Sequence, residues 1–230
     1  MQKSHEAVQG GEPSSRARGR PRAFDRKAAL DQATRLFWAQ GYEATSIADL
    51  TRAMGIGSPS LYAAFGSKEA LYAEALQHYA DTNEHLVWAA FHSAETARGA
   101  VMAFLMDSAA ALTGCVADLP RGCMVTLSSV GCEGYAGLGE IVRNARGVTL
   151  ARLEARLARA VTDGEIAASA DLRALARFIQ TVQAGMSILA RDGATRAELE
   201  DMAGVAMSGW DARTNIPAVK AGHRGARSLH

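Results

Sequence analysis

The 230-residue sequence has few proline and aromatic residues and contains no long apolar segment. Five prolines and 6% aromatic residues, alongside abundant alanine, leucine and arginine, are typical of an α-helical chain. No apolar run approaches the ~20 residues that a membrane-spanning helix needs. The N-terminus also lacks the apolar core of a secretory signal peptide. We therefore expect an all-α protein that neither contacts a membrane nor is secreted.

Cysteine is scarce as well. The three cysteines are widely spaced along the chain, at Cys115, Cys123 and Cys132. Secreted domains use closely patterned cysteines for disulfides, whereas a few separate thiols fit the reducing cytoplasm better. This predicts a cytoplasmic protein without a disulfide framework.

The common enzyme and metal motifs are absent too. The sequence has no P-loop, no G-x-S-x-G elbow and no H-E-x-x-H. His78, His85 and His92 repeat every seven residues, but two helical turns separate neighbours by about 10.5 Å, too far to share one ion. We expect no enzyme, no cofactor and no metal. The alternative is a helical enzyme with Cys123 as nucleophile and one of these histidines as base.

Charge is distributed unevenly, although the net charge is only +1. Residues 1–68 carry ten Lys/Arg and six Asp/Glu, while the remainder carries fifteen and eighteen. A basic front suggests contact with a polyanion. Residues 1–23 are aperiodic and predicted to be a disordered basic arm. Its alternating arginines, which include Arg20 and Arg22, can follow phosphates or enter a minor groove; a solubilising tail is the alternative.

Three short helices are predicted next, each with a capping residue before it and a glycine after it. The expected N-caps are Asp25, Ser46 and Ser58, and the terminating glycines are Gly41, Gly55 and Gly66. Pro59 then falls at the first position of the third helix, where proline is tolerated. These boundaries define two short helices within residues 46–65, joined by a tight turn.

The third helix has one apolar side and one polar side. Leu61 and Phe65 are four residues apart and should face the core, which leaves Ser58, Ser60 and Tyr62 outside. Two such helices joined by a glycine turn form a helix-turn-helix, whose second helix can enter a major groove. A general architectural DNA binder with little sequence preference is the alternative.

Residues 24–83 resemble the DNA-binding domain of the TetR family of transcriptional regulators. The segment GYEATSIADLTRAMGIGSPSLYAAFGSKEALY carries the landmarks: Gly-Tyr before the second helix, Thr45-Ser46, Gly55-Ile56, Leu61-Tyr62 with Phe65, and Lys68-Glu69-Ala-Leu. The resemblance implies an all-α homodimer with an N-terminal three-helix reader and a C-terminal ligand-binding and dimerisation domain. It further implies a double-stranded DNA operator and a small-molecule inducer that releases the protein.

The resemblance also assigns DNA-contacting residues. Those expected to hold phosphates are Thr45, Ser46, Tyr62 and Lys68, together with Arg20 and Arg22, which reach backbone or minor groove. Those expected at base edges are Ser58, Pro59 and Ser60, with Pro59 against a thymine methyl.

The C-terminal domain is predicted over residues 84–212, followed by a disordered tail over 213–230. Further helices are expected at about 68–91, 95–113, 121–130, 137–162, 170–190 and 195–210. The helix 170–190 carries an uninterrupted apolar seam: Leu172, Leu175, Ile179, Val182, Met186 and Leu189. We interpret helices 170–190 and 195–210 as the homodimer interface; ordinary packing inside the subunit is the alternative.

Large, soft side chains mark a ligand chamber in this domain, unless they are plain core. They are Trp88, Phe91, Met102, Phe104, Met106, Met124 and Tyr135. Cys123 follows Arg121-Gly122 at a predicted helix start, and a helix N-terminus beside an arginine favours a reactive thiolate. The sequence therefore predicts a ligand-responsive dimeric repressor of a near-palindromic operator. A regulator that senses oxidants or electrophiles through Cys123 is the alternative, and three inert buried thiols are the simpler reading.

Overall fold

The computed structural model describes residues 24–116, 118–130 and 134–214. Within these residues every regular element is a helix, as the composition predicts. In chain order they are α1 (Arg26–Gln40), α2 (Ile47–Met54), α3 (Ser58–Phe65), α4 (Lys68–Asn83), α5 (His85–Ser93), α6 (Ala97–Leu112), α7 (Met124–Leu127), α8 (Ala136–Thr162), α9 (Leu172–Asp192), α10 (Arg196–Ser208) and α11 (Trp210–Thr214). No described helix is long and apolar enough to cross a membrane.

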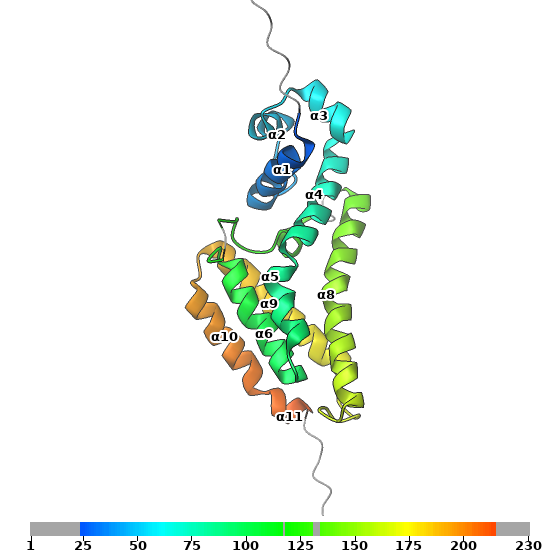
Figure 1. Cartoon of the computed structure of the whole chain (residues 1–230), viewed down its shortest axis with the longest axis vertical. Coiled ribbons are helices and arrows are strands. Elements are labelled where there is room, and N and C mark those ends of the chain that lie inside the picture. The colour runs from blue at the N-terminus through cyan, green and yellow to red at the C-terminus, as the bar shows by residue number, and fades with distance from the viewer. Residues whose placement is uncertain (1–23, 117, 131–133, 215–230) are drawn as a thin grey trace, which may run out of the picture.

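The molecule is elongated, and its helices fall into two parts (Figure 1). Helices α1, α2 and α3 sit together at one end, and α4 runs from them toward the rest of the chain. We call residues 24–83 the reader and residues 84–214 the body. In the body, α5, α6, α9 and α10 lie together, and the long α8 flanks them and extends back toward the reader.

The reader begins and ends its helices almost where the sequence predicts. Asp25 accepts a hydrogen bond from the Ala28 amide (3.0 Å), and Ser46 forms a reciprocal capping box with Asp49. Gly55 adopts the left-handed conformation (φ 68°, ψ 29°) that turns α2 into α3. One cap differs: Gly57 occupies the N-cap of α3, so Ser58 is already its first helical residue.

The helix predicted over about 68–91 is interrupted at Glu84, which separates α4 from α5. Short polar side chains just before this point compete for backbone carbonyls. The Thr82 hydroxyl donates to the His78 carbonyl (2.7 Å), and the Asn83 amide donates to the Tyr79 carbonyl (3.0 Å). Such bonds weaken and bend helices, which accounts for a break that apolar periodicity does not reveal.

Two further boundaries differ from the prediction. The helix expected at 121–130 is only the single turn α7, because Arg121 and Gly122 form a turn and Ser128 is extended. The disordered tail was expected to start at 213, but residues 213 and 214 belong to α11, which continues to Thr214. Thr214 is buried, and its carbonyl accepts a hydrogen bond from the Ala167 amide (3.0 Å). The rest of the predicted tail and the basic arm lie outside the described residues.

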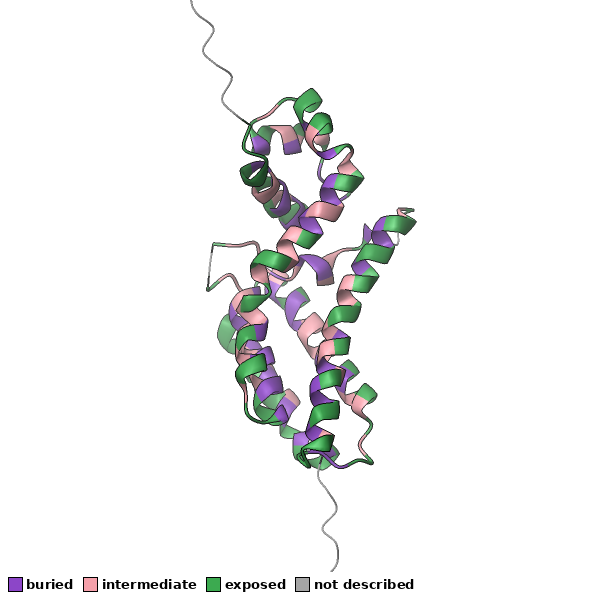
Figure 2. Ribbon diagram, turned by 45° about the vertical axis from the view of Figure 1, so that its right-hand side comes forward, coloured by how far each residue is buried: buried purple, intermediate pink, exposed green. Residues whose placement is uncertain are grey.

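Figure 2 shows buried residues in both the reader and the body. They form two hydrophobic clusters. The body cluster joins α5, α6, α9, α10, α11 and the second half of α8. The reader cluster joins α1–α4 but also takes in α7 and the first turns of α8, through Met124, Val125, Leu138 and Val142. The predicted boundary at 83/84 therefore does not separate two independent cores, because α7 and the first turns of α8 belong to the body but pack in the reader cluster.

Candidate nucleic-acid interface and ligand chamber

Helix α3 presents a polar face to solvent. Leu61 and Phe65 are buried, at 0% and 4% exposure, as their spacing predicts. The outward residues are Ser58, Pro59, Ser60 and Tyr62, all exposed. Among the described residues none of the three hydroxyls has a hydrogen-bond partner, and Tyr62 is 47% exposed. This face can therefore offer hydroxyl donors and acceptors without breaking any internal bond.

The start of α2 is a second polar edge of the reader. The Ser46 hydroxyl accepts from the Asp49 amide (3.1 Å) and donates to the Asp49 carboxylate (2.6 Å). That donated bond and a second one from the Ser46 amide (3.2 Å) lower the pKa of Asp49. Ser46 stays exposed beside the free amides of the first turn, where anions bind well. Thr45 differs: it is 0% exposed and its hydroxyl donates to the Gly41 carbonyl (2.7 Å). This burial contradicts a phosphate contact by the Thr45 side chain.

Lys68 lies at the start of α4, on the same end of the molecule. Its ammonium is 4.2 Å from the centre of the Tyr42 ring, a cation–π contact that holds the side chain against the reader. The Tyr42 hydroxyl donates to Glu69 (3.0 Å), and burial together with this carboxylate raises the pKa of Tyr42. Arg20 and Arg22 lie outside the described residues.

Arg26 supports α3 from behind, and sequence reasoning missed it. Its guanidinium donates to both oxygens of Glu74 (2.8 Å each) and to the Ala64 carbonyl in the last turn of α3 (3.3 Å). It also stacks over Phe65, 4.5 Å from the ring centre. One side chain thus ties α1, α3 and α4 together. No local motif announces this role, because Glu74 is 48 residues away.

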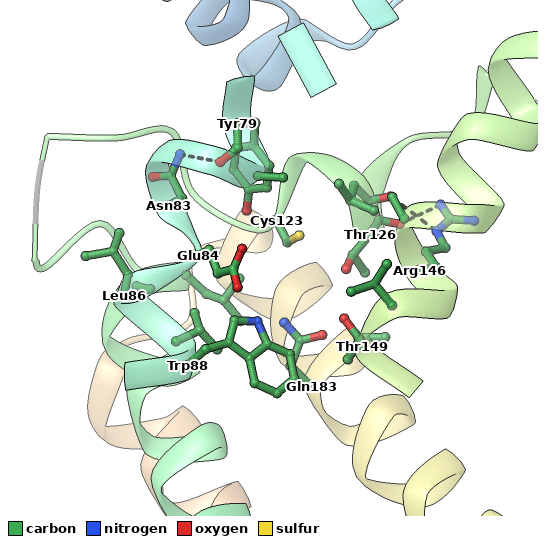
Figure 3. A pocket seen from close by; sticks show the side chains of 18 of the residues that line it. Tyr79, Asn83, Glu84, Leu86, Trp88, Cys123, Thr126, Arg146, Thr149 and Gln183 are labelled. Carbon is green, nitrogen blue, oxygen red and sulfur yellow. Dashed lines mark hydrogen bonds between the residues drawn. The ribbon is translucent and has the colours of Figure 1, made fainter. Parts of the chain in front are cut away.

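A cavity of about 730 Å³ lies between the reader and the body. This volume is in the range of small-molecule binding sites. Its walls come from α1, α4, α5, α6, α8 and α9, and the segment around Cys123 closes one side. Trp38 and Tyr79 of the reader face the same space as Trp88 and Phe104 of the body. We call this cavity the chamber (Figure 3).

Of the seven predicted chamber residues, Trp88 and Phe104 line the cavity and the others do not. Phe91, Met102 and Met106 pack in or against the body cluster. Met124 and Tyr135 belong with the reader cluster, where the Tyr135 ring is 5.0 Å from that of Tyr42. These five side chains do not line this cavity, because helical periodicity identifies apolar positions without showing which of them meets a cavity and which a neighbouring helix.

The chamber has polar groups that the sequence did not single out. Arg152 on α8 pairs with Glu84 (2.6 Å) and lies over Trp88, 5.0 Å from the ring centre. Thr149 on α8 and Gln183 on α9 also line the chamber (Figure 3), and neither has a hydrogen-bond partner among the described residues. An aromatic floor with an internally balanced ion pair and free hydroxyl and amide groups suits a small organic molecule.

Arg146 has a different task at the chamber wall. Its guanidinium donates to the carbonyls of Val125 (3.2 Å), Thr126 (3.0 Å) and Ser128 (2.6 Å), which lie in α7 and just after it. These carbonyls have no helical partners, so the arginine satisfies the C-terminal end of a one-turn helix. Arg146 therefore fixes α7 to α8 and has little capacity left for a ligand.

Cys123 is half-buried and lines the chamber. It packs against both hydrophobic clusters. Figure 3 places its thiol near the Tyr79 side chain. The pKa of the Tyr79 hydroxyl is raised, mainly by burial and to a smaller extent by its interaction with the Cys123 thiol. Cys115 is exposed, and Cys132 lies outside the described residues. The Cys123 thiol is thus the one described cysteine at the chamber.

The predicted dimer seam on α9 faces mainly inward. Ile179 and Met186 are 2% and 0% exposed and belong to the body cluster, while Leu172, Leu175 and Val182 pack partly against it. Leu189 is the exposed member, at 40%. Other apolar side chains are more exposed, and each lies one position before a residue of the predicted interface. They are Phe178 and Ile188 on α9, and Val205 on α10. Packing inside the subunit, the alternative interpretation, therefore explains most of the seam.

Comparisons with known proteins agree with this architecture. Residues 29–75 match the family described as "Bacterial regulatory proteins, tetR family". The chain is 36% identical over 200 residues to the HTH-type transcriptional repressor ComR of Escherichia coli K12, covering 85% of this chain and 93% of ComR. It is 47% identical over 68 residues to the repressor BdcR of the same strain, covering 30% of this chain and 34% of BdcR.

A solved structure is similar over nearly the same length. It is a cysteine mutant of the TetR family transcriptional regulator CifR, complexed with 26-bp double-strand operator DNA. That chain is 39% identical, with a TM-score of 0.78, and the match covers 84% of this chain and all of the other. The relatives are transcriptional regulators rather than enzymes. On the extent and identity of these matches, the chain belongs to the TetR family of transcriptional regulators.

Proposed function

We propose that this protein is a homodimeric repressor that binds a near-palindromic DNA operator and is released when a small molecule occupies the chamber. The observation that carries the proposal is the free polar face of α3, held rigid from behind by Arg26. ComR is described as a repressor, and CifR is bound to operator DNA, which supports the same role for this chain.

The exposed residues divide by what they can contact. Ser58, Pro59 and Ser60 lie at the first turn of α3, where side chains reach base edges in a major groove. Tyr62 and Lys68 can donate to phosphates, as can the amides at the start of α2, whereas the Ser46 hydroxyl must first give up its bond to Asp49. Arg20 and Arg22 would extend the contact into the backbone or minor groove.

Dimerisation is proposed through α9 and α10, on the outward face rather than on the predicted seam. Phe178 and Val205 are more than half exposed and border the same surface hollow between α9 and α10, and large exposed apolar side chains on adjacent helices mark an association surface. A two-fold dimer would place two α3 helices one DNA turn apart, about 34–36 Å, to read a near-palindrome.

The chamber supports regulation because it is shared between the two parts of the chain. Trp38 and Tyr79 belong to the reader, whereas Trp88, Thr149 and Gln183 belong to the body. A molecule bound here contacts both, so it can stabilise one relative placement of reader and body over another. Differential binding of that kind is what an inducer requires.

Selection of bound duplexes from a random DNA library, with purified reduced protein at moderate salt, tests the proposal. Recovery of a near-palindrome would support a dimeric, sequence-specific regulator. Recovery of no shared sequence, with binding that fades uniformly as salt rises, would identify a non-specific binder and contradict the proposal.

A second candidate function is thiol sensing, favoured by the position of Cys123 inside the chamber. Alkylation of Cys123 would place a new group between reader and body and release the operator, with Cys115 or Cys132 as resolving thiols for an oxidised form. The test treats the wild type and a Cys123→Ser variant with N-ethylmaleimide. Equal operator affinity before and after treatment of the wild type would exclude this role.

A further inference from the structure

The reader and the body meet at the segment 121–123, where backbone groups are closely packed. Gly122 has φ +79°, and a Cβ atom there would come within 2.9 Å of the Ser187 carbonyl oxygen. The Gly122 amide donates to the Leu112 carbonyl (2.8 Å), and the Cys123 amide donates to the Ser187 hydroxyl (2.8 Å). The segment is therefore held firmly on α6 and α9, the body side of the junction.

Arg191, near the end of α9, connects this segment to the reader. Its Nε donates to the Arg121 carbonyl, and its two terminal nitrogens donate to the carbonyls of Trp38 and Ala39, each at 2.8 Å. Trp38 and Ala39 lie in the last turn of α1, where carbonyls have no helical partner and the helix dipole favours a cation. A planar guanidinium can satisfy three carbonyls at once, which an ammonium cannot do in the same geometry.

The contact between α1 and the body also includes a hydrogen bond that α1 donates. The Trp38 indole nitrogen donates to the Gly122 carbonyl (2.9 Å), and both groups are buried. The end of α1 thus gives one bond to the segment and takes two from Arg191. Because α9 also lines the chamber through Ala184 and Ile188, the helix that holds α1 is one that a chamber ligand would contact.

Helix α1 carries this anchorage to the DNA-facing end. It spans 15 residues, about 22 Å at the helical rise per residue. At its far end Arg26 bonds the Ala64 carbonyl of α3, as described above. The helix is therefore a rod with one arginine fixing each end: Arg191 to the body and Arg26 to α3.

We propose that Arg191 is a positioning residue that fixes the tilt of α1 on the body and thereby the separation of half-sites that the dimer accepts. This inference rests on the proposed function and adds a determinant of operator spacing that lies far from the DNA. In a dimer held through α9, a change of tilt at each α1 alters the distance between the two α3 helices.

The test measures affinity for the selected operator and for versions with central base pairs added or removed one at a time. The variants are Arg191→Met and Arg191→Lys, with Arg173→Met as control, since Arg173 is exposed on the same helix and has no partner among the described residues. Affinity ratios between operators do not depend on the fraction of folded protein, so instability alone cannot produce the effect.

We expect Arg191→Met to reduce the wild-type preference for one spacing by about tenfold, the size of a lost charge-assisted bond, and Arg191→Lys to be intermediate. Trp38→Phe, which removes the indole bond to Gly122 but keeps the backbone carbonyl that Arg191 contacts, should shift the ratio in the same direction. A uniform fall in affinity for every spacing would show that Arg191 is only structural and overturn the inference. If the wild type itself selects no paired half-sites, the proposed function fails as well.

Discussion

The reader and the body differ in where their cores come from. The body cluster is built within the body, whereas the reader cluster borrows α7 and the first turns of α8. Leu138 and Val142 on α8 pack in the reader cluster, while Leu153 and Leu157 on the same helix pack in the body cluster. The reader is therefore not an autonomous three-helix module. Its stability depends on body residues that lie beside the chamber, which is a physical route for coupling the two.

The largest expected effect tests this division of α8 directly. Leu138→Ala and Leu153→Ala each remove a buried leucine, and each should cost about 2–5 kcal/mol of unfolding free energy. Native-state hydrogen exchange should distinguish them. Leu138→Ala is expected to accelerate exchange in α1 and α4, and Leu153→Ala in α6 and α9. Identical patterns for the two variants would mean that the clusters open as one unit.

A smaller effect is expected at the segment between the two clusters. Gly122→Ala places a methyl group at positive φ, 2.5 Å from the Leu127 Cδ1 atom, and should cost about 1–3 kcal/mol. Gly147→Ala is the matched control, because that exposed position in α8 has open space around it. Gly147→Ala should raise the unfolding free energy by about 0.5–1 kcal/mol. Urea unfolding at one fixed protein concentration measures both, and equal effects would show that the segment is not tightly packed.

The same contrast explains how much the sequence could predict. In the reader, caps and turns are local: Asp25, Ser46 and Gly55 act on residues within one helical turn, so short patterns locate α1, α2 and α3. In the body, the cavity depends on how distant helices cross. Trp38 and Gly122 are 84 residues apart in the chain and form one wall. Periodicity carries no such information, which is why Tyr135 was assigned to the chamber although it packs on the reader.

The apolar seam on α9 was interpreted as a dimer interface for a related reason. An apolar repeat shows that one side of a helix is buried, but a core and a dimer partner produce the same repeat. Ile179 and Met186 are buried by their own subunit. Three and seven residues after the outward Phe178, the same side of the helix carries Thr181 and Gly185, so this side has no apolar repeat of its own. Only the exposed fractions in the structure separate the two faces.

The DNA-facing surface allows a prediction of intermediate size. Tyr62→Phe removes a hydroxyl that has no partner among the described residues, so unfolding free energy should stay unchanged. Affinity should fall by about 1 kcal/mol, roughly fivefold, for operator and unrelated DNA alike, because phosphate contacts carry no sequence information. Ser60→Ala should instead change which base is preferred at one position. Competition binding with single-base operator variants measures both, and a changed base preference in Tyr62→Phe would contradict its phosphate role.

The smallest effect concerns an ion pair inside the reader. Asp31 on α1 contacts His78 on α4 (2.5 Å) and Lys27 (3.3 Å). Burial raises the pKa of Asp31, but the bonds to His78 and Lys27 outweigh it, and the net pKa is lowered. A carboxylate with a depressed pKa stabilises the fold above its unfolded value of about 3.9 and loses that contribution as pH falls through the folded value.

Asp31→Asn should therefore reduce unfolding free energy at pH 7, and the difference should shrink as the pH falls from 7 through the folded pKa of Asp31, where the carboxylate gains its proton. Because the carboxylate is 39% exposed, solvent screening limits the difference to below about 1 kcal/mol. Denaturant unfolding of both proteins across this pH range gives the measurement. A cost that is equal at both ends would assign the effect to hydrogen-bond geometry rather than charge. The pair would then fix α1 against α4 in the same way at every pH, leaving Arg26 as the charged contact on which the placement of α3 depends.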